Sequence, residues 1–202
     1  MIGEMLQGLD YFGTAVFAVT GALVADRKRM DLMGFLILAT VTGIGGGTLR
    51  DLLLDRPVFW LTQWEYLVIT AVTAIVTFYA SKPFHQRANW LPWADAVGLA
   101  AFCVIGTQIA LSMEANPMIA VMMGIMTAAF GGLIRDVLAG EPPLLLHREI
   151  YASAALVGGI VYVLFAHWLE WPIAAVVLGF LVTLAVRGLG IRYHWHLPSA
   201  DR

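Results

Sequence analysis

The sequence predicts an all-α membrane protein with seven transmembrane helices, arranged as two inverted three-helix repeats followed by a seventh helix. Three observations lead to this class: an apolar composition, seven apolar runs of membrane-spanning length, and a pattern that recurs along the chain. Of the 202 residues, 60% are hydrophobic and 13% are charged, and the mean hydropathy is +0.79. Soluble domains carry about 25% charged residues, so this chain has too little polar surface to cover itself in water.

Each apolar run is long enough to cross a hydrocarbon core of about 30 Å at about 1.5 Å per helical residue. Several runs begin with residues that are typical of a helix start. Asp10, Asp31 and Asp95 stand where N-caps stand, and Asn116 precedes a first-turn proline, Pro117. In order, the predicted helices span residues 9–25, 32–54, 64–80, 95–113, 117–139, 150–168 and 172–190.

A glycine-rich segment that ends in an Arg-Asp pair occurs twice at an offset of 85 residues, since 131 − 46 = 85 and 135 − 50 = 85. The first copy comprises Gly45, Gly46, Gly47, Thr48, Leu49, Arg50 and Asp51, and the second comprises Phe130, Gly131, Gly132, Leu133, Ile134, Arg135 and Asp136. Further identities at this offset include Asp10 with Asp95, Thr42 with Thr127, Pro57 with Pro142, and Tyr66 with Tyr151. Such agreement without gaps indicates an internal duplication.

The duplication predicts three-helix repeats at about residues 10–80 and 95–165 and an extra helix at about residues 172–190, all within one membrane domain of residues 1–202. Because three is odd, the second repeat enters the membrane from the opposite side, so the repeats are expected to be inverted. Inverted repeats with glycine-interrupted helices at matching positions indicate a solute pathway at the repeat interface.

Basic residues predict the orientation of the chain. One side of the predicted helices holds Arg27, Lys28, Arg29, Lys82, Arg87, Arg148, Arg187, Arg192 and Arg202. The other side holds little beyond Arg56, with Arg50 near it. Cytoplasmic loops of membrane proteins carry an excess of Lys and Arg, so we expect the N-terminus outside and the C-terminus in the cytoplasm.

The two Arg-Asp pairs are the main candidates for a functional site, because charge inside a membrane segment is costly and marks a pathway for polar solutes. In a straight helix from Asp31, Arg50 lies about 28 Å along the axis, near the far interface. One interpretation is that Arg50 and Arg135 are snorkelling end residues, each paired with the neighbouring Asp51 or Asp136. The other is that the glycines bend or unwind the helix and turn the arginines towards a water-filled space.

The candidate pore and gating residues are therefore Gly45, Gly46, Gly47, Arg50, Asp51, Gly131, Gly132, Arg135 and Asp136. Asp10, Asp95, Thr42 and Thr127 are candidate pore-lining residues, although N-capping is the simpler explanation for the two aspartates. A glycine cluster also serves close helix packing, because Gly43 and Gly47 form a small-xxx-small pattern. Both uses of the glycines are compatible.

Other chemistry is not indicated by the sequence. The single cysteine, Cys103, allows no internal disulfide and no metal-ligand spacing. His194 and His196 alternate as a metal pair does, but they follow the last apolar run and are expected at the headgroups. The sequence has no Ser/His/Asp arrangement, phosphate loop or His-Glu-x-x-His motif, so we predict no catalytic residue, no cofactor, no metal and no enzyme. It also has no basic patch with interleaved aromatic residues, so no nucleic-acid partner is expected.

The doubled motif, together with Thr20-Gly21-Ala22 before it, resembles the prokaryotic trimeric intracellular cation channels, a family also described as having glycine-transporter-like domains. The resemblance covers nearly the whole chain. It implies a homotrimer in a bacterial inner membrane, with membrane lipids as neighbours and a pore through each protomer for monovalent cations, chiefly potassium. It also implies kinks in the second and fifth helices at the glycines. Phe130 stands where the first copy has Gly45, which implies a stiffer second break.

Two functions remain open from the residues. A channel provides an uninterrupted wet path for cations driven by the membrane potential. A secondary transporter uses the same repeats to carry a small zwitterion such as glycine, with Arg50 or Arg135 holding its carboxylate and an aspartate its amine. A positive arginine counts against a cation pore unless Asp51 and Asp136 neutralise it or it acts as a gate.

Overall fold

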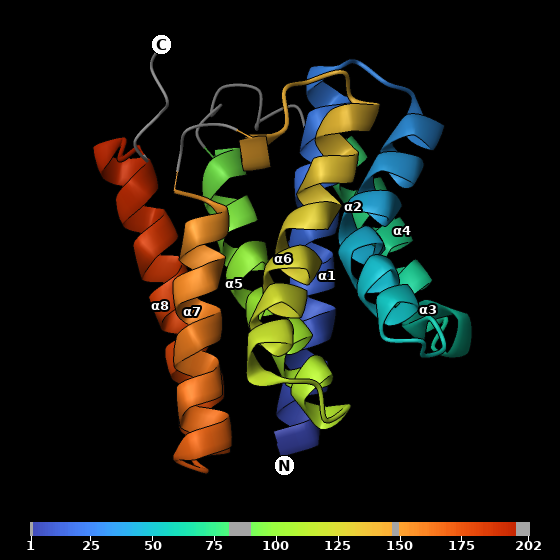
Figure 1. Ribbon diagram of the computed structural model, residues 1–202. Coiled ribbons are helices and arrows are strands. Elements are labelled where there is room, and N and C mark those ends of the chain that lie inside the picture. Colours follow the sequence, from blue (N-terminus) through green and yellow to red (C-terminus); the bar gives the residue numbers. More distant parts are fainter. Residues whose placement is uncertain (1, 81–89, 147–149, 197–202) are drawn as a thin grey trace.

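A computed structural model describes residues 2–80, 90–146 and 150–196, and these residues form a bundle of helices that run between two ends (Figure 1). The elements are α1 (Ile2–Arg27), α2 (Leu32–Leu53), α3 (Phe59–Thr62), α4 (Glu65–Ala80), α5 (Trp90–Ser112), α6 (Pro117–Leu138), η2 (Leu144–Leu146), α7 (Ala152–Val163), the π-helical turn η3 (Leu164–Trp168) and α8 (Pro172–Tyr193). Every apolar run of the sequence overlaps with at least one of these helices.

Among the described residues, five helices are long and apolar enough to cross a membrane: α1, α2, α5, α6 and α8. Two shorter apolar helices, α4 and the continuous segment Ala152–Trp168, account for the other two apolar runs. The chain is thus an all-helical membrane protein, as its composition predicts.

The predicted helix starts are confirmed at two positions and wrong at two. Asp31 caps α2 by accepting a hydrogen bond from the Gly34 amide at 2.8 Å, and Asn116 caps α6 ahead of Pro117. Asp10 and Asp95, in contrast, lie inside α1 and α5, because these helices begin earlier, at residues 2 and 90. Their carboxylates bond to neighbouring helices instead of to their own helix starts.

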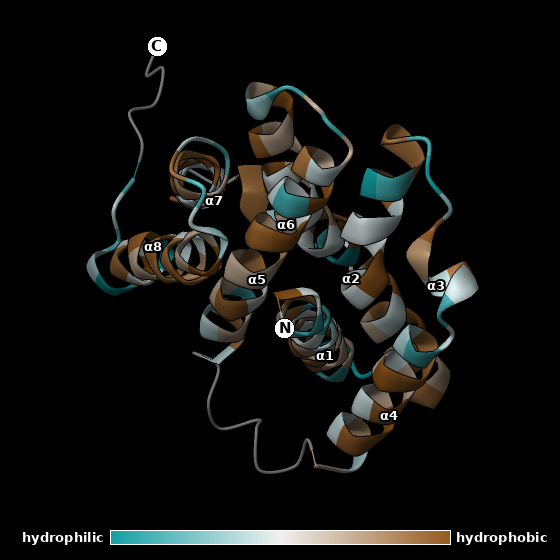
Figure 2. Ribbon diagram, turned by 90° about the horizontal axis from the view of Figure 1, so that it is seen from below, coloured by the Kyte–Doolittle hydropathy of each residue, from teal (hydrophilic) through white to brown (hydrophobic). Residues whose placement is uncertain are grey.

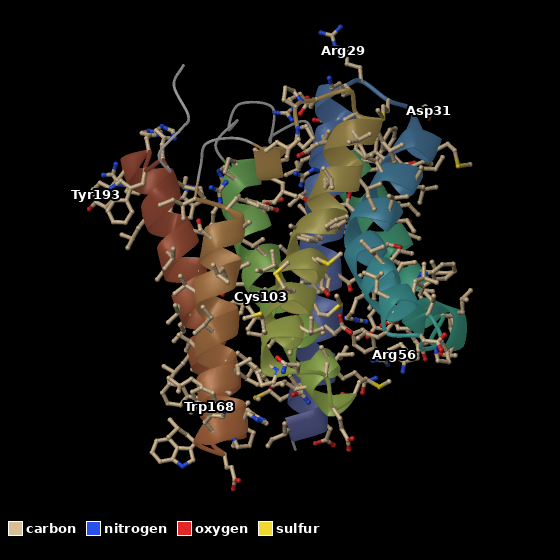
Figure 3. All side chains as sticks on the ribbon, viewed as in Figure 1. Arg29, Asp31, Arg56, Cys103, Trp168 and Tyr193 are labelled. Atoms are coloured by element: carbon tan, nitrogen blue, oxygen red, sulfur yellow. The ribbon has the colours of Figure 1, made fainter. Side chains whose placement is uncertain are left out.

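Helix α1 occupies a central place in the bundle and contacts α2, α4 and α5. Viewed along the helices, α7 and α8 stand on the other side of α5 (Figure 2). The chain passes back and forth between the two ends of the bundle. Arg29, Asp31 and Tyr193 lie at one end, and Arg56 and Trp168 lie at the other (Figure 3).

Contacts between α1 and α5 pair residues at the offset of 85. The Phe17 and Phe102 rings lie 5.1 Å apart between centroids. Each ring packs against the glycine that precedes the other ring by four residues: Phe17 on Gly98 and Phe102 on Gly13. A Cβ atom on Gly98 would overlap the Phe17 ring, so the absent side chain makes space for this aromatic pair.

Helices α2 and α6 meet through backbone at the glycines of the repeated motif. A Cβ atom on Gly46 would collide with the Thr127 carbonyl oxygen, and one on Gly131 would collide with the Thr42 carbonyl oxygen. Both helices remain α-helical without interruption through these residues, so the glycines do not unwind them. The glycines instead allow two backbones to approach closely, as a small-xxx-small pattern does in membranes.

This contact predicts that alanine lowers the stability of the protein at Gly46 and Gly131 but not at the neighbouring Gly45. Gly46→Ala or Gly131→Ala would push against backbone, and overpacking costs about 1–3 kcal/mol, more than the ~1 kcal/mol gained in helix propensity. We therefore expect a lower melting temperature in detergent for both variants. Gly45→Ala is the control, because the nearest atom to its new methyl is the flexible end of Ile134, at 3.1 Å, and the nearest backbone atom is 4.0 Å away, so its melting temperature should not fall. A rise for Gly46→Ala would contradict this packing.

Candidate functional site

Both Arg-Asp pairs of the repeated motif are buried inside the chain. Arg50 and Arg135 are 1% and 0% exposed, and Asp51 and Asp136 are 0% and 4% exposed. A snorkelling arginine extends its guanidinium out to the headgroups, so that interpretation is wrong for both positions. The arginines turn inward at the ends of α2 and α6 although these helices are not unwound.

Each aspartate of the motif joins its own arginine to the segment that follows the helix. Asp51 Oδ1 accepts from Arg50 Nε at 2.8 Å, and Asp51 Oδ2 accepts from the Phe59 amide at 2.9 Å. In the second copy, Asp136 accepts from Arg135 Nε at 2.9 Å and from the Leu144 amide at 3.0 Å. The residues correspond one to one, since 144 − 59 = 85. Both carboxylates therefore have both oxygens bonded, as a buried charge requires.

Positive φ angles let the chain turn back to these carboxylates. Asp55 has φ +50° and Gly140, at the matching position, has φ +65°. One residue later, the amide of Arg56 donates to the Asp51 carbonyl at 3.0 Å, and that of Glu141 donates to the Asp136 carbonyl at 2.9 Å. The second copy carries glycine at the turn, and the first carries aspartate, which tolerates this conformation.

The second copy has two contacts that have no match in the first copy among the described residues. Arg135 Nη1 donates to Asp95 Oδ1 of α5 and to Thr20 Oγ1 of α1, both at 2.9 Å. We call Arg135, Asp136, Asp95 and Thr20 the Arg135 cluster. The position that matches Thr20 is Ile105, which has no hydroxyl to accept from Arg50. The Arg135 cluster therefore connects three helices, α1, α5 and α6.

Around Arg50 the contacts differ. The Arg50 guanidinium carbon lies 5.6 Å from the centroid of the Phe59 ring. Asp10, the counterpart of Asp95, accepts from the Tyr66 hydroxyl of α4 at 2.8 Å. Arg56, at the exposed side, also approaches Asp51, with 3.5 Å between Nε and Oδ1. Arg135 thus has two carboxylates around one guanidinium, whereas Asp51 has two guanidinium groups around one carboxylate.

Glycines of the motif leave room for the arginine head groups. A Cβ atom on Gly132 would lie 3.2 Å from Tyr151 Oη, 3.4 Å from Arg135 Nη2 and 3.5 Å from Asp95 Oδ1. On Gly47, a Cβ atom would lie 3.5 Å from Arg50 Nη2 and would overlap the Phe59 ring. The last glycine of each motif, Gly47 or Gly132, therefore serves the charged site, and the glycine before it, Gly46 or Gly131, serves the contact between helices.

The predicted threonines are buried but committed to their own helices. Thr42 donates to the Leu38 carbonyl, and Thr127 donates to the Met123 carbonyl. Their side chains lie against Gly21 and Gly106, respectively, of the neighbouring helices. Such back-bonding satisfies the hydroxyl within its helix, so these residues form part of the packing around the site.

Arg187 of α8 is a buried charged residue that sequence reasoning placed among the tail residues. It is 1% exposed, donates from Nη1 to the Ile150 carbonyl at 3.0 Å, and lies with its guanidinium carbon 5.1 Å from the centroid of the Tyr151 ring. The available signal was its spacing, because Arg187 follows the buried Thr183 and Gly179 at intervals of four residues, on the same helix face.

Comparison with known proteins places this geometry in a family. A family model described as glycine transporter matches the chain twice, at residues 7–82 and 92–167, and the two matches are again 85 residues apart. The trimeric intracellular cation channel orthologue from Rhodobacter sphaeroides is 44% identical, with a TM-score of 0.91 over 95% of this chain and 99% of that chain. This chain belongs to the prokaryotic trimeric intracellular cation channel family.

Other members agree over similar lengths. A prokaryotic channel of this family, solved in 0.5 M KCl, is 31% identical with a TM-score of 0.89 and covers 96% of this chain and 99% of that chain. The inner membrane protein YadS of Escherichia coli K12 is 46% identical over 96% of both chains. Membership of this channel family agrees with the prediction that the chain is not an enzyme.

The paired charges predict a large loss of stability on neutralisation. Asp51→Asn leaves the buried Arg50 without its carboxylate, and breaking a buried ion pair costs about 3–5 kcal/mol. We expect a lower melting temperature in detergent and less folded protein. Asp55→Asn is the matched control, because Asp55 is exposed and asparagine tolerates its positive φ, so its melting temperature should be unchanged. Equal melting of both variants would show that the pair does not stabilise the fold.

Proposed function

We propose that this protein is a cation channel permeable to potassium and other monovalent cations, and that it assembles as a homotrimer with a separate pore through each protomer. The observation that carries the proposal is the likeness to the Rhodobacter sphaeroides channel orthologue over almost the full length of both chains. The relatives include an inner membrane protein, which supports an inner membrane location with lipids around the bundle.

The proposed pore lies between two inverted repeats, at about residues 10–80 and 95–165, in a membrane domain of residues 1–202 with an extra helix, α8. Matching contacts at the offset of 85 support the duplication, and opposite directions of α1 and α5 support the inversion (Figure 1). We further propose that seven helices span the membrane with the N-terminus outside and the C-terminus in the cytoplasm. Arg29, which belongs to the basic segment after α1, and Tyr193, which ends α8, lie at the same end of the bundle (Figure 3). An excess of basic residues marks the cytoplasmic side, so this placement supports a cytoplasmic C-terminus.

Gating is proposed to act at the ends of α2 and α6. Arg135 ties α6 to Thr20 of the first repeat and to Asp95 of the second. A path between the repeats widens there only when a contact across them is released, and the hydrogen bond to Thr20 is such a contact. The arginines do not exclude cations in this arrangement, because Asp51 and Asp136 pair with them and Asp95 adds a further negative charge beside Arg135.

A second candidate, transport of a small zwitterion such as glycine, is favoured by the description of the family model that matches both halves. In this alternative, Arg50 or Arg135 holds the carboxylate of the solute. Both Nε atoms already donate to neighbouring aspartates, so a carboxylate ligand has to share the guanidinium or displace Asp51 or Asp136. We favour the channel for this reason and because of the structural likeness.

Planar-bilayer recording separates the two candidates. Purified protein should produce discrete unitary currents that are selective for cations, and the reversal potential under opposed potassium and sodium solutions gives their permeability ratio. Addition of glycine should leave these currents unchanged. Flux that requires glycine and lacks unitary openings would reject the channel and support the transporter.

Thr20→Val tests the gate. Valine keeps the shape but removes the acceptor for Arg135, and a hydrogen bond to a charged group is worth about 1.5–3 kcal/mol. We expect the open probability to rise by about tenfold or more, with unitary conductance unchanged, in single-channel recordings. Thr183→Val is the control, because the Thr183 hydroxyl donates to the Gly179 carbonyl within α8. If the two variants gate alike, the Thr20 contact does not hold the pore closed.

A further inference from the structure

A pocket of about 340 Å³ opens where α5 begins and α8 ends. Pro92 and Trp93 of α5 and Leu144 of η2 form one part of its wall, and the last turns of α8 and the segment that follows this helix form the rest. The pocket adjoins the second Arg-Asp motif, because the amide of Leu144 donates to Asp136, but its basic side chains all belong to α8 and the residues that follow it.

All the ionisable residues in the described lining of this pocket are basic. Arg187, Arg192, His194 and His196 line it, and no Asp or Glu is among its described lining residues. Arg187 is buried, whereas the other three are exposed, so the pocket leads from basic side chains at the surface to a buried guanidinium. We call it the basic pocket.

Arg187 is held in place at the buried side of the pocket. Its Nη1 donates to the Ile150 carbonyl at 3.0 Å, and its guanidinium stacks near the Tyr151 ring. These contacts orient a planar group that has five donors, and they restrict its rotamers before a ligand arrives. A pre-oriented guanidinium binds oxyanions with a smaller entropic cost.

Amphipathic aromatic residues lie in the lining of the pocket and next to it in the chain. Trp93 lines the pocket and is 44% exposed, and Tyr193 and Trp195, on either side of the lining residue His194 in the chain, are 61% and 48% exposed. In membrane proteins such rings settle at the level of the lipid headgroups. Tyr193 lies at the same end of the bundle as Arg29 and far from Trp168 (Figure 3). The basic pocket therefore faces the layer in which the phosphates of phospholipids lie, and basic pockets between helices at this level recognise such headgroups.

We propose that the basic pocket binds a phosphate group, presented by an anionic phospholipid or as a free ion. Arg192 provides a guanidinium that matches phosphate oxygens in pairs, Arg187 adds a fixed positive charge at the buried side, and the two histidines add further donors. The proposal goes beyond ion conduction, since binding here requires neither an open pore nor a particular permeant ion.

The test uses the full chain in detergent micelles and measures melting temperature and native mass spectra. The probes are phosphatidylglycerol, zwitterionic phosphatidylcholine and inorganic phosphate. Phosphatidylglycerol should raise the melting temperature more than phosphatidylcholine does and remain bound in the mass spectra. In the double variant Arg192→Gln/His196→Gln, both changes are exposed and should leave the fold intact, and the apparent affinity should fall about tenfold or more.

Arg29→Gln is the matched control, because it removes one positive charge at the same end of the bundle but outside the pocket. It should bind as the unchanged chain does. Protection by phosphatidylglycerol alone assigns the phosphate to a lipid, and protection by inorganic phosphate alone assigns it to a free ion. The proposal is overturned if neither protects, or if the double variant and Arg29→Gln bind equally.

Discussion

A buried guanidinium that bonds to the aspartate next to it is the interaction on which much of this structure depends. An arginine at the end of an apolar helix is costly in a low-dielectric interior unless its charge is matched. Asp51 and Asp136 match it and at the same time hold the amides of Phe59 and Leu144. One carboxylate thus fixes the arginine and, by binding an amide of the segment after the helix, sets the path of that segment. The same device at both positions gives the two halves of the chain the same local geometry.

Much of the helical architecture could be predicted from apolar runs and the offset of 85, because both are properties of the sequence alone. The caps at Asp31 and Asn116 were also predictable from local chemistry. Asp10 and Asp95 were not, since an aspartate before an apolar run looks like a cap whether the helix begins there or earlier. Only the neighbouring helix, which brings Tyr66 or Arg135 to the carboxylate, decides its role.

The candidate site was predicted in its residues but not in its connections. The doubled motif identified Arg135, yet its bond to Thr20 depends on how α1 packs against α6, and local sequence does not encode that distance. Arg187 was missed for a related reason, because an arginine near the end of a last helix is usually a surface residue. The two halves therefore share a motif and differ in what surrounds it, since Thr20 is matched by Ile105.

The crossing of α2 and α6 at Gly46 and Gly131 has a mechanical consequence. Where two helices touch through interlocked side chains, any relative movement forces those side chains into new rotamers. Here a smooth glycine surface meets the carbonyl oxygens of Thr127 and Thr42, and the arrangement is reciprocal. Such a contact offers little resistance to sliding or rolling along the interface. What keeps α2 and α6 together at Gly46 and Gly131 is therefore mainly the close approach of their backbones.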